Sequence, residues 1–122
     1  MFPSGVWRGF WEQAGFGRQA MDDITLHFRN GEITGQGRDS VELFTFHGDY
    51  VETTGEIWLT KKYQGRHEVE YRGRPDGEGC ILGTWTIKER IGGEDAVWTG
   101  PFILQPVMTR PSGEEPIFEI VR

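Results

Sequence analysis

The chain has 122 residues, a length that suits one domain with a single hydrophobic core. Its formal net charge of −6 argues against nucleic-acid binding, which needs a positive surface, and its one cysteine excludes an internal disulfide. No apolar run approaches the roughly 18 residues of a membrane-spanning helix, and the N-terminus lacks the pattern of a signal peptide. We therefore expect a cytoplasmic protein that contacts neither nucleic acid nor membrane.

Short stretches that alternate apolar and polar residues follow one another along the chain, and period-two alternation is typical of strands with one buried face. The sequence predicts eight strands, at residues 6–13, 20–29, 32–37, 41–47, 54–63, 66–72, 80–88 and 97–104. Turn residues separate them. Asn30-Gly31 is the strongest hairpin signal, and the composition of segments 73–77 and 92–95 predicts a turn and a loop.

Strands at this spacing, with no helical periodicity between them, predict an all-β protein. We expect a single antiparallel eight-stranded up-and-down β-barrel over residues 1–106, because closure leaves no edge strand exposed. A two-sheet β-sandwich is the main alternative. Eighteen glycines fit a protein of tight turns and kinked strands.

Residues 107–122 form an extension beyond the last expected strand. Its large apolar residues are Ile117, Phe118, Ile120 and Val121. Left exposed, they would present on the order of several hundred Å² of apolar surface, the scale at which patches mark contacts. We expect this segment to pack on a second copy of the chain and form a homodimer, or else to fold back on its own barrel.

The first expected strand opens with Gly5-Val6-Trp7, and hairpins follow one after another. This pattern resembles the calycin superfamily of lipocalins, fatty-acid-binding proteins and avidins, in a bacterial branch of calycin-like barrels. The resemblance implies a tryptophan across the closed end of the barrel and one small ligand inside it. The second lipocalin signature, a Thr-Asp-Tyr type motif, is absent, and segment 62–73 has no counterpart in avidins, so biotin binding is carried over to no residue.

Four residues are candidates for contacting such a ligand: His67, Tyr71, Tyr63 and Trp85. Alternation places His67 and Tyr71 on one face of the sixth expected strand, opposite four charged residues, and therefore inside. It places Tyr63 with Ile57, Leu59 and Lys61 on one face of the fifth strand. Polar tips within an aromatic pocket are the usual composition of a ligand cavity. The alternative is that these polar atoms satisfy one another or the backbone.

Basic residues gather in one stretch, at Lys61, Lys62, Arg66, Arg72 and Arg74. We interpret it as the solvated face of a hairpin, with a phosphate-binding patch as the alternative. The glycine-bearing segments 15–18 and 35–39 each carry an arginine but open no helix, so neither forms a phosphate cradle. Their arginines are expected to cap strand ends or to pair with Asp22 and Asp39.

The sequence supports no metal, cofactor or catalytic site. The three histidines, His27, His47 and His67, lie twenty residues apart on different expected strands. The serines lie in no nucleophile motif, and Cys80 has the surroundings of a small strand residue.

The leading hypothesis is therefore non-catalytic binding of a small, partly apolar molecule in the barrel mouth. A structural or protein-interaction module is the alternative, with Trp58 as an exposed contact beside the C-terminal apolar segment. A small barrel enzyme ranks third.

Overall fold

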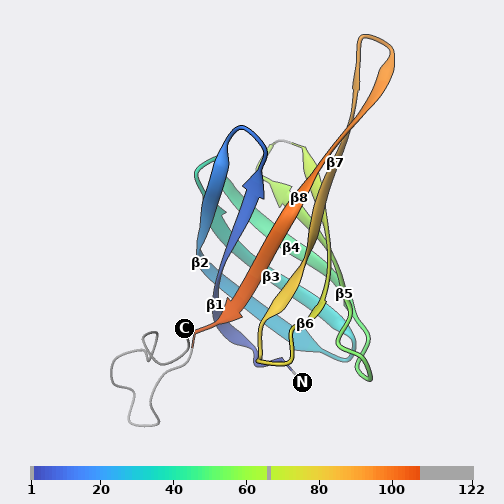
Figure 1. The fold of residues 1–122 in the computed structure, drawn as a ribbon. Coiled ribbons are helices and arrows are strands. Elements are labelled where there is room, and N and C mark those ends of the chain that lie inside the picture. Colours follow the sequence, from blue (N-terminus) through green and yellow to red (C-terminus); the bar gives the residue numbers. More distant parts are fainter. Residues whose placement is uncertain (1, 66, 108–122) are drawn as a thin grey trace.

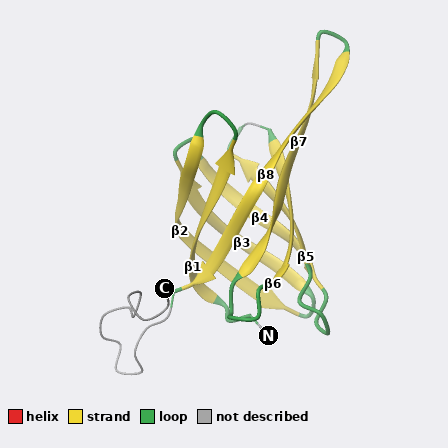
Figure 2. Cartoon of the chain, in the orientation of Figure 1, coloured by secondary structure: helices red, strands yellow, loops and turns green. Residues whose placement is uncertain are grey.

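The computed structural model describes residues 2–65 and 67–107, and these form one closed barrel of eight antiparallel strands (Figures 1 and 2). The strands are β1 (Gly5–Gln13), β2 (Gly17–Arg29), β3 (Glu32–Asp39), β4 (Leu43–Tyr50), β5 (Ile57–Tyr63), β6 (Glu68–Pro75), β7 (Ile81–Ile91) and β8 (Glu94–Pro106). Each strand pairs with the next, and β8 pairs with β1. The predicted all-β up-and-down barrel is confirmed, and the sandwich alternative is excluded by closure.

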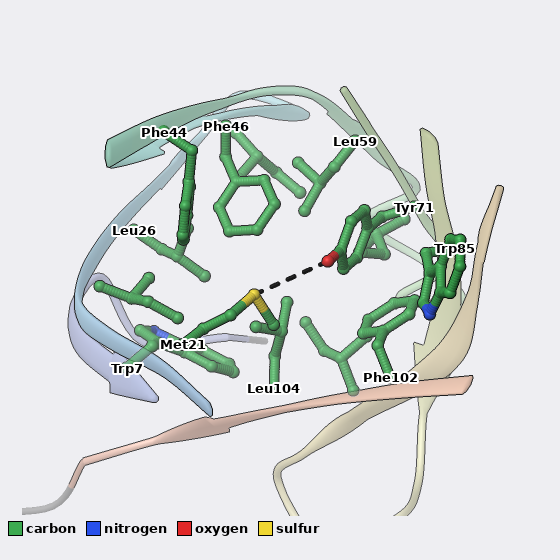
Figure 3. Close-up of a cluster of buried hydrophobic side chains, with 14 of the residues drawn as sticks. Trp7, Met21, Leu26, Phe44, Phe46, Leu59, Tyr71, Trp85, Phe102 and Leu104 are labelled. Atoms are coloured by element: carbon green, nitrogen blue, oxygen red, sulfur yellow. Dashed lines mark hydrogen bonds between the residues drawn. The ribbon is translucent and has the colours of Figure 1, made fainter. Parts of the chain in front are cut away.

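Alternation along each strand divides the side chains into an inner and an outer set. In β5, for example, Ile57, Leu59, Lys61 and Tyr63 are buried, while the intervening side chains are exposed or half-buried. The inner set fills the barrel: Trp7, Met21, Ile24, Leu26, Ile33, Phe44, Phe46, Ile57, Leu59, Tyr63, Val69, Tyr71, Ile81, Trp85, Phe102 and Leu104. Figure 3 shows these side chains meeting across the interior.

Of two predicted turns, the structure confirms one and shortens the other. Asn30 and Gly31 both have positive φ, 51° and 80°, which is the backbone of a type I′ turn, and this hairpin is confirmed. The turn predicted at 73–77 is wrong in its first half, because Gly73 pairs with Gly83 and Pro75 with Ile81 as the end of β6. Pro75 is tolerated there because a strand end does not need every N–H.

One end of the barrel is closed by aromatic side chains. Trp7 is buried, its ring centroid lies 6.1 Å from that of Phe2 and 5.6 Å from that of Phe28, and its Nε1 donates to the carbonyl oxygen of Pro3 at 2.9 Å. Tyr50 continues the cluster, 5.5 Å from Phe28. This is the lower end in Figure 1, where β1 begins and β8 ends. Any access to the interior is therefore at the opposite end.

At that opposite end β7 and β8 run past the other strands as a two-stranded ribbon (Figure 1). The pairing of β7 with β6 ends at Thr86, and the pairing of β8 with β1 ends at Phe102. Beyond those positions the two strands pair only with each other, from Ile87 opposite Trp98 to Ile91 opposite Glu94. The loop predicted at 92–95 is shorter than expected, because Glu94 and Asp95 already belong to β8.

The described residues contain no helix long and apolar enough to cross a membrane. Residues 117–121 and Arg66 lie outside the described part of the chain.

Candidate functional site

An internal ion pair lies below the open end of the barrel. Lys61 Nζ, from β5, is 2.6 Å from Asp39 Oδ2, at the end of β3, and the two side chains are 1% and 0% exposed. Among the charged residues of the described chain, Lys61 is the one that is buried in both backbone and side chain. The prediction that Lys61 belongs to the solvated face of a hairpin is wrong. Its aliphatic stem occupies the inner face of β5, as alternation requires, and Asp39 compensates its charge.

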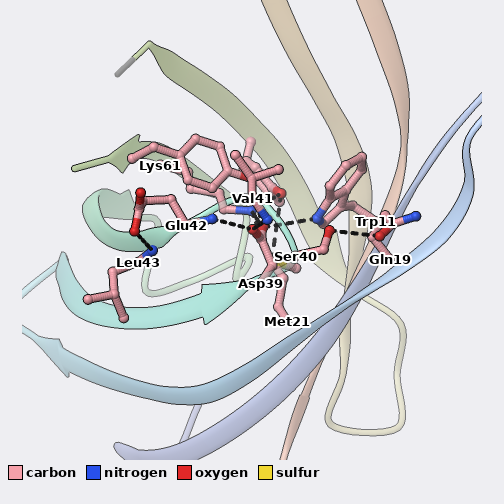
Figure 4. A network of polar contacts seen from close by, with 11 residues as sticks. Trp11, Gln19, Met21, Asp39, Ser40, Val41, Glu42, Leu43 and Lys61 are labelled. Carbon is pink, nitrogen blue, oxygen red and sulfur yellow. Dashed lines mark hydrogen bonds and ion pairs between the residues drawn. The ribbon is translucent and has the colours of Figure 1, made fainter. Parts of the chain in front are cut away.

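Asp39 is the acceptor on which the whole network converges (Figure 4). Its Oδ2 also accepts from Tyr63 OH at 2.7 Å and from Trp11 Nε1 at 3.1 Å. Its Oδ1 accepts from the backbone N–H of Val41 at 2.9 Å, which fixes the β3–β4 loop. Five donors on one carboxylate, counting Lys61 and the longer contact from the Glu42 amide at 3.4 Å, hold it ionised and in place.

The ammonium of Lys61 is enclosed by aromatic rings and soft acceptors. It donates to Tyr71 OH at 3.3 Å and to Met21 Sδ at 3.5 Å. Its Nζ lies 4.3 Å from the ring centroid of Phe44 and 4.7 Å from that of Tyr63. Cation–π attraction of this kind replaces part of the hydration that the ammonium has lost.

Burial and pairing shift the pKa values of these groups. Burial lowers the pKa of Lys61 to about 8, although the Asp39 charge opposes the shift. Burial by itself would raise the pKa of Asp39, but the Lys61 charge and the hydrogen bonds from Lys61, Tyr63 and the Val41 amide bring it below its usual value. Burial also raises the pKa of Tyr63 and of Tyr71. At neutral pH the network is therefore an ion pair with two neutral tyrosines.

A cavity of about 300 Å³ opens at the barrel mouth directly above this network. Its lining residues are Trp11, Gln13, Val41, Tyr63, His67, Val69, Tyr71, Trp85, Ile87, Glu89 and Trp98. Trp11, Tyr63 and Tyr71 belong to both the cavity and the network. The cavity therefore stands on side chains that the ion pair holds in place.

Trp85 forms a wall of the cavity and is fixed by two contacts. Its Nε1 donates to the carbonyl oxygen of Glu12 at 2.9 Å, and its ring meets that of Trp11 edge to face at 5.9 Å between centroids. Gly100, opposite Trp85 on β8, leaves the space for this ring, since a Cβ there would lie 2.8 Å from the indole nitrogen. The position of the Trp85 indole thus depends on a glycine at position 100.

The structure brings the four predicted ligand residues to one cavity. Tyr63, Tyr71 and Trp85 point inward and are buried, as alternation predicts. The prediction that His67 points inward is wrong: it precedes β6, is exposed, and lies over the Tyr63 ring at the cavity rim, 5.5 Å between centroids. Strand alternation does not apply to a residue outside the strand.

Other predicted contacts fall elsewhere. Trp58 is 51% exposed on the outer wall, as expected, and the guanidinium of Arg72 stacks on its ring at 4.5 Å. Arg38 pairs with Asp23 at 2.6 Å, so the expected pairing of an arginine with Asp39 is wrong. The interface residues Ile117, Phe118, Ile120 and Val121 lie outside the described residues.

Two other possible sites were the single thiol and a cluster of metal-binding side chains. Cys80 is buried, and burial together with the nearby Asp76 raises the pKa of its thiol, which therefore stays protonated at neutral pH. Within residues 2–65 and 67–107, no three histidine, cysteine or acidic side chains are placed to hold a metal ion.

No family model, no curated protein and no solved structure matches the chain. The barrel and its cavity therefore have to be interpreted from their own residues.

Proposed function

We propose that this protein binds one small, partly apolar molecule in the mouth of the barrel and does not transform it. The observation that carries the proposal is the cavity of about 300 Å³, walled by aromatic and apolar side chains at the open end of an otherwise filled barrel. That volume lies at the lower end of the range for small-molecule sites. It suits a compound with one ring and a short chain.

The chemistry of the floor supports a defined orientation for the ligand. In the described chain every buried side-chain nitrogen and oxygen already has a hydrogen-bond partner. The indole N–H of Trp11 and the hydroxyl of Tyr63 already donate to Asp39, and the indole N–H of Trp85 already donates to the carbonyl oxygen of Glu12. A polar group pushed onto this floor would lose its water without gaining a partner. The apolar end of the ligand therefore enters first, and its polar end stays at the rim.

The same saturation supports binding over catalysis. Lys61, Asp39, Tyr63 and Tyr71 are the residue types of an acid–base site, but they hydrogen-bond one another and Lys61 is fully buried. A general base or nucleophile has to reach the reacting atom of the substrate. Here the reactive atoms hold the floor of the cavity together.

Tryptophan fluorescence tests the proposal, because Trp11, Trp85 and Trp98 line the cavity. We expect saturable quenching by members of a library of small arylalkyl compounds. Ile87→Phe, which narrows the cavity from the ribbon, should weaken binding by about tenfold or more, since a filled site excludes the ligand. Val97→Phe is the matched control: Val97 pairs with Lys88 on the opposite face of the ribbon and is 61% exposed.

Two results would contradict the proposal. One is a library without any saturable response. The other is an equal effect of Ile87→Phe and Val97→Phe, because only the first substitution changes the cavity.

We also propose that the chain is a calycin-like barrel that works in the cytoplasm. The closed eight-stranded up-and-down barrel, with Trp7 packed in its closed end, supports the first point. The single free thiol, Cys80, agrees with the second, since free cysteines persist in reducing compartments.

A further inference from the structure

We propose that the polar end of the ligand is a cation, an alkylammonium held at the rim between the indole rings of Trp85 and Trp98 and the carboxylate of Glu89. This inference rests on the proposed function and adds the chemical class of the ligand. It follows from the charges at the cavity, from the indole rings that line it, and from the register of the β7–β8 ribbon.

Among the described residues that line the cavity, Glu89 is the only aspartate, glutamate, lysine or arginine. The ammonium of Lys61 beneath the floor is compensated by Asp39 at 2.6 Å, and Arg90 on the ribbon has Asp95 at 3.6 Å. A carboxylate ligand would therefore meet the like charge of Glu89 and find His67 and Gln13, but no lysine or arginine of the described lining, as donors, whereas an ammonium would find an opposite charge.

Strand register places the three rim residues along one face of the ribbon. Trp85, Ile87 and Glu89 alternate on β7, and Trp98 lies directly opposite Ile87. Trp98 is thus a diagonal neighbour of both Trp85 and Glu89, at the spacing of about 7–8 Å that long side chains bridge. An ammonium seated there lies within reach of two indole rings and one carboxylate.

The indoles at this face offer their rings to a ligand. The N–H of Trp85 donates to Glu12, so the ring of this indole is what it can offer to a ligand in the cavity that it lines. Indole has the most favourable ring for a cation, and an aromatic enclosure with a nearby carboxylate is the usual receptor for ammonium groups. At the rim the ammonium also keeps part of its hydration shell, which lowers the cost of binding.

The floor is an unsuitable place for the ligand's charge because Lys61 already uses it. Its Nζ lies 5.6 Å from the ring centroid of Trp11, 5.5 Å from Tyr71 and 4.7 Å from Tyr63. A second cation on these rings would face the first one. Trp85 and Trp98 also line the cavity and have no such contact with Lys61 in the described structure, so their rings are not already occupied by a cation.

Three probes of equal shape test the inference: 3-phenylpropylamine, a cation at pH 7, 3-phenylpropan-1-ol, which is neutral, and 3-phenylpropionate, an anion. We expect the amine to bind about tenfold more tightly than the alcohol, the sum of modest cation–π and ion-pair contributions, and the anion to bind most weakly. Titrations are followed on the indole N–H signals of the ¹⁵N-labelled protein. The signals of Trp11, Trp85 and Trp98 should move, while Trp7, in the closed end, and Trp58, on the outer wall, serve as internal references.

Two variants locate the charge preference. Glu89→Gln should weaken the amine about two- to fivefold and leave the alcohol unchanged, because only the ammonium uses the carboxylate. Glu70→Gln is the matched control, since Glu70 is exposed on the outer face of β6. Trp98→Leu should likewise reduce the preference for the amine over the alcohol.

Equal affinity for the amine and the alcohol, or an equal loss of both in Glu89→Gln, would overturn the cation assignment and leave the apolar site standing. If none of the three probes moves the cavity tryptophans at millimolar concentration, the proposed function and this inference fail together. Tighter binding of the anion would refute the charge argument alone.

Discussion

Replacing Asp39 by asparagine is the most informative perturbation of this barrel, because it changes charge and hydrogen bonding while keeping shape. The carboxylate accepts on both oxygens: Lys61, Tyr63 and Trp11 donate to Oδ2, and the Val41 amide donates to Oδ1. An asparagine offers one acceptor oxygen and one NH₂ group. Whichever way it is oriented, the NH₂ faces at least one donor, which is left without a partner.

The size of the loss follows from two terms. Each buried donor without a partner costs about 1–3 kcal/mol. Lys61, deprived of its counter-ion, either stays charged or gives up its proton. Losing the proton at pH 7 from an ordinary lysine pKa costs about 4–5 kcal/mol, at roughly 1.4 kcal/mol per pH unit. This is the upper limit of the cost of leaving Lys61 without its counter-ion. We expect Asp39→Asn to lower the free energy of unfolding by about 3–5 kcal/mol, as for other buried pairs broken on one side.

Lys61→Met is the matched comparison. It removes the ammonium but keeps an unbranched side chain, and Asp39 keeps its donors from Tyr63, Trp11 and Val41. We expect a smaller loss, of about 1–3 kcal/mol. The double variant should lose less than the sum of the two single variants, because both remove the same ion pair.

Urea unfolding at pH 7, followed by tryptophan fluorescence, measures these differences as shifts of the midpoint at constant slope. The reasoning is refuted if Lys61→Met costs as much as Asp39→Asn, or if the two losses add. The first result would mean that Asp39 is merely one partner of a pair and not the acceptor on which the network depends. The second would mean that Asp39 and Lys61 do not stabilise each other.

Two further predictions concern pH and assembly. Between about pH 8 and 10 the unfolded chain keeps the Lys61 proton that the folded chain has released, so the wild type should gain stability relative to Lys61→Met by at most about 1.4 kcal/mol per pH unit. Parallel urea titrations should show this gap widening above pH 8, and a constant gap would contradict the low pKa of Lys61. The homodimer predicted from residues 117–121 should be lost on deletion of residues 114–122. Light scattering checks this, and a full-length monomer at tens of micromolar would contradict it.

The fold was predictable because alternation alone separates the inner from the outer face of a strand. In β5 it grouped Ile57, Leu59 and Lys61 correctly on one face, which the structure shows to be the inner one. It was less reliable at the ends: Gly73 to Pro75 have the composition of a turn, yet pairing with β7 extends β6 through them. Where a hairpin ends is decided by the partner strand, and composition does not contain that information.

The site was predictable only in part. Tyr63, Tyr71 and Trp85 lie at the expected cavity because each is inside a strand. The network was missed because the charge of Lys61 was given more weight than its phase. Asp39 has the same signal: it follows Ile33, Gly35 and Gly37 at intervals of two, and that face is the inner one. Two inward residues of opposite charge, on strands that are not neighbours, were a detectable sign of an internal ion pair.

The ion pair and the cavity at the barrel mouth form one structural unit. Its floor is rigid, and the wall formed by the ribbon is adaptable. Asp39 fixes Trp11 and Tyr63 in the floor and the Val41 amide in the β3–β4 loop, so this side of the cavity has its shape before any ligand arrives. A prearranged floor adds little ordering cost on binding. The opposite wall is formed by the ribbon, where Glu89 and Trp98 belong to the stretches of β7 and β8 that pair only with each other.

A two-stranded ribbon is marginally stable by itself, so this wall is the part that can move. The geometry therefore separates two properties of the site. Variants of Asp39 or Lys61 should change the stability of the barrel together with the shape of the floor. Variants of Glu89 or Trp98 should change which molecules bind while leaving the barrel intact. Under the proposed function, selectivity for the ligand would therefore be set by the ribbon, while the buried charges keep the floor of the cavity in place.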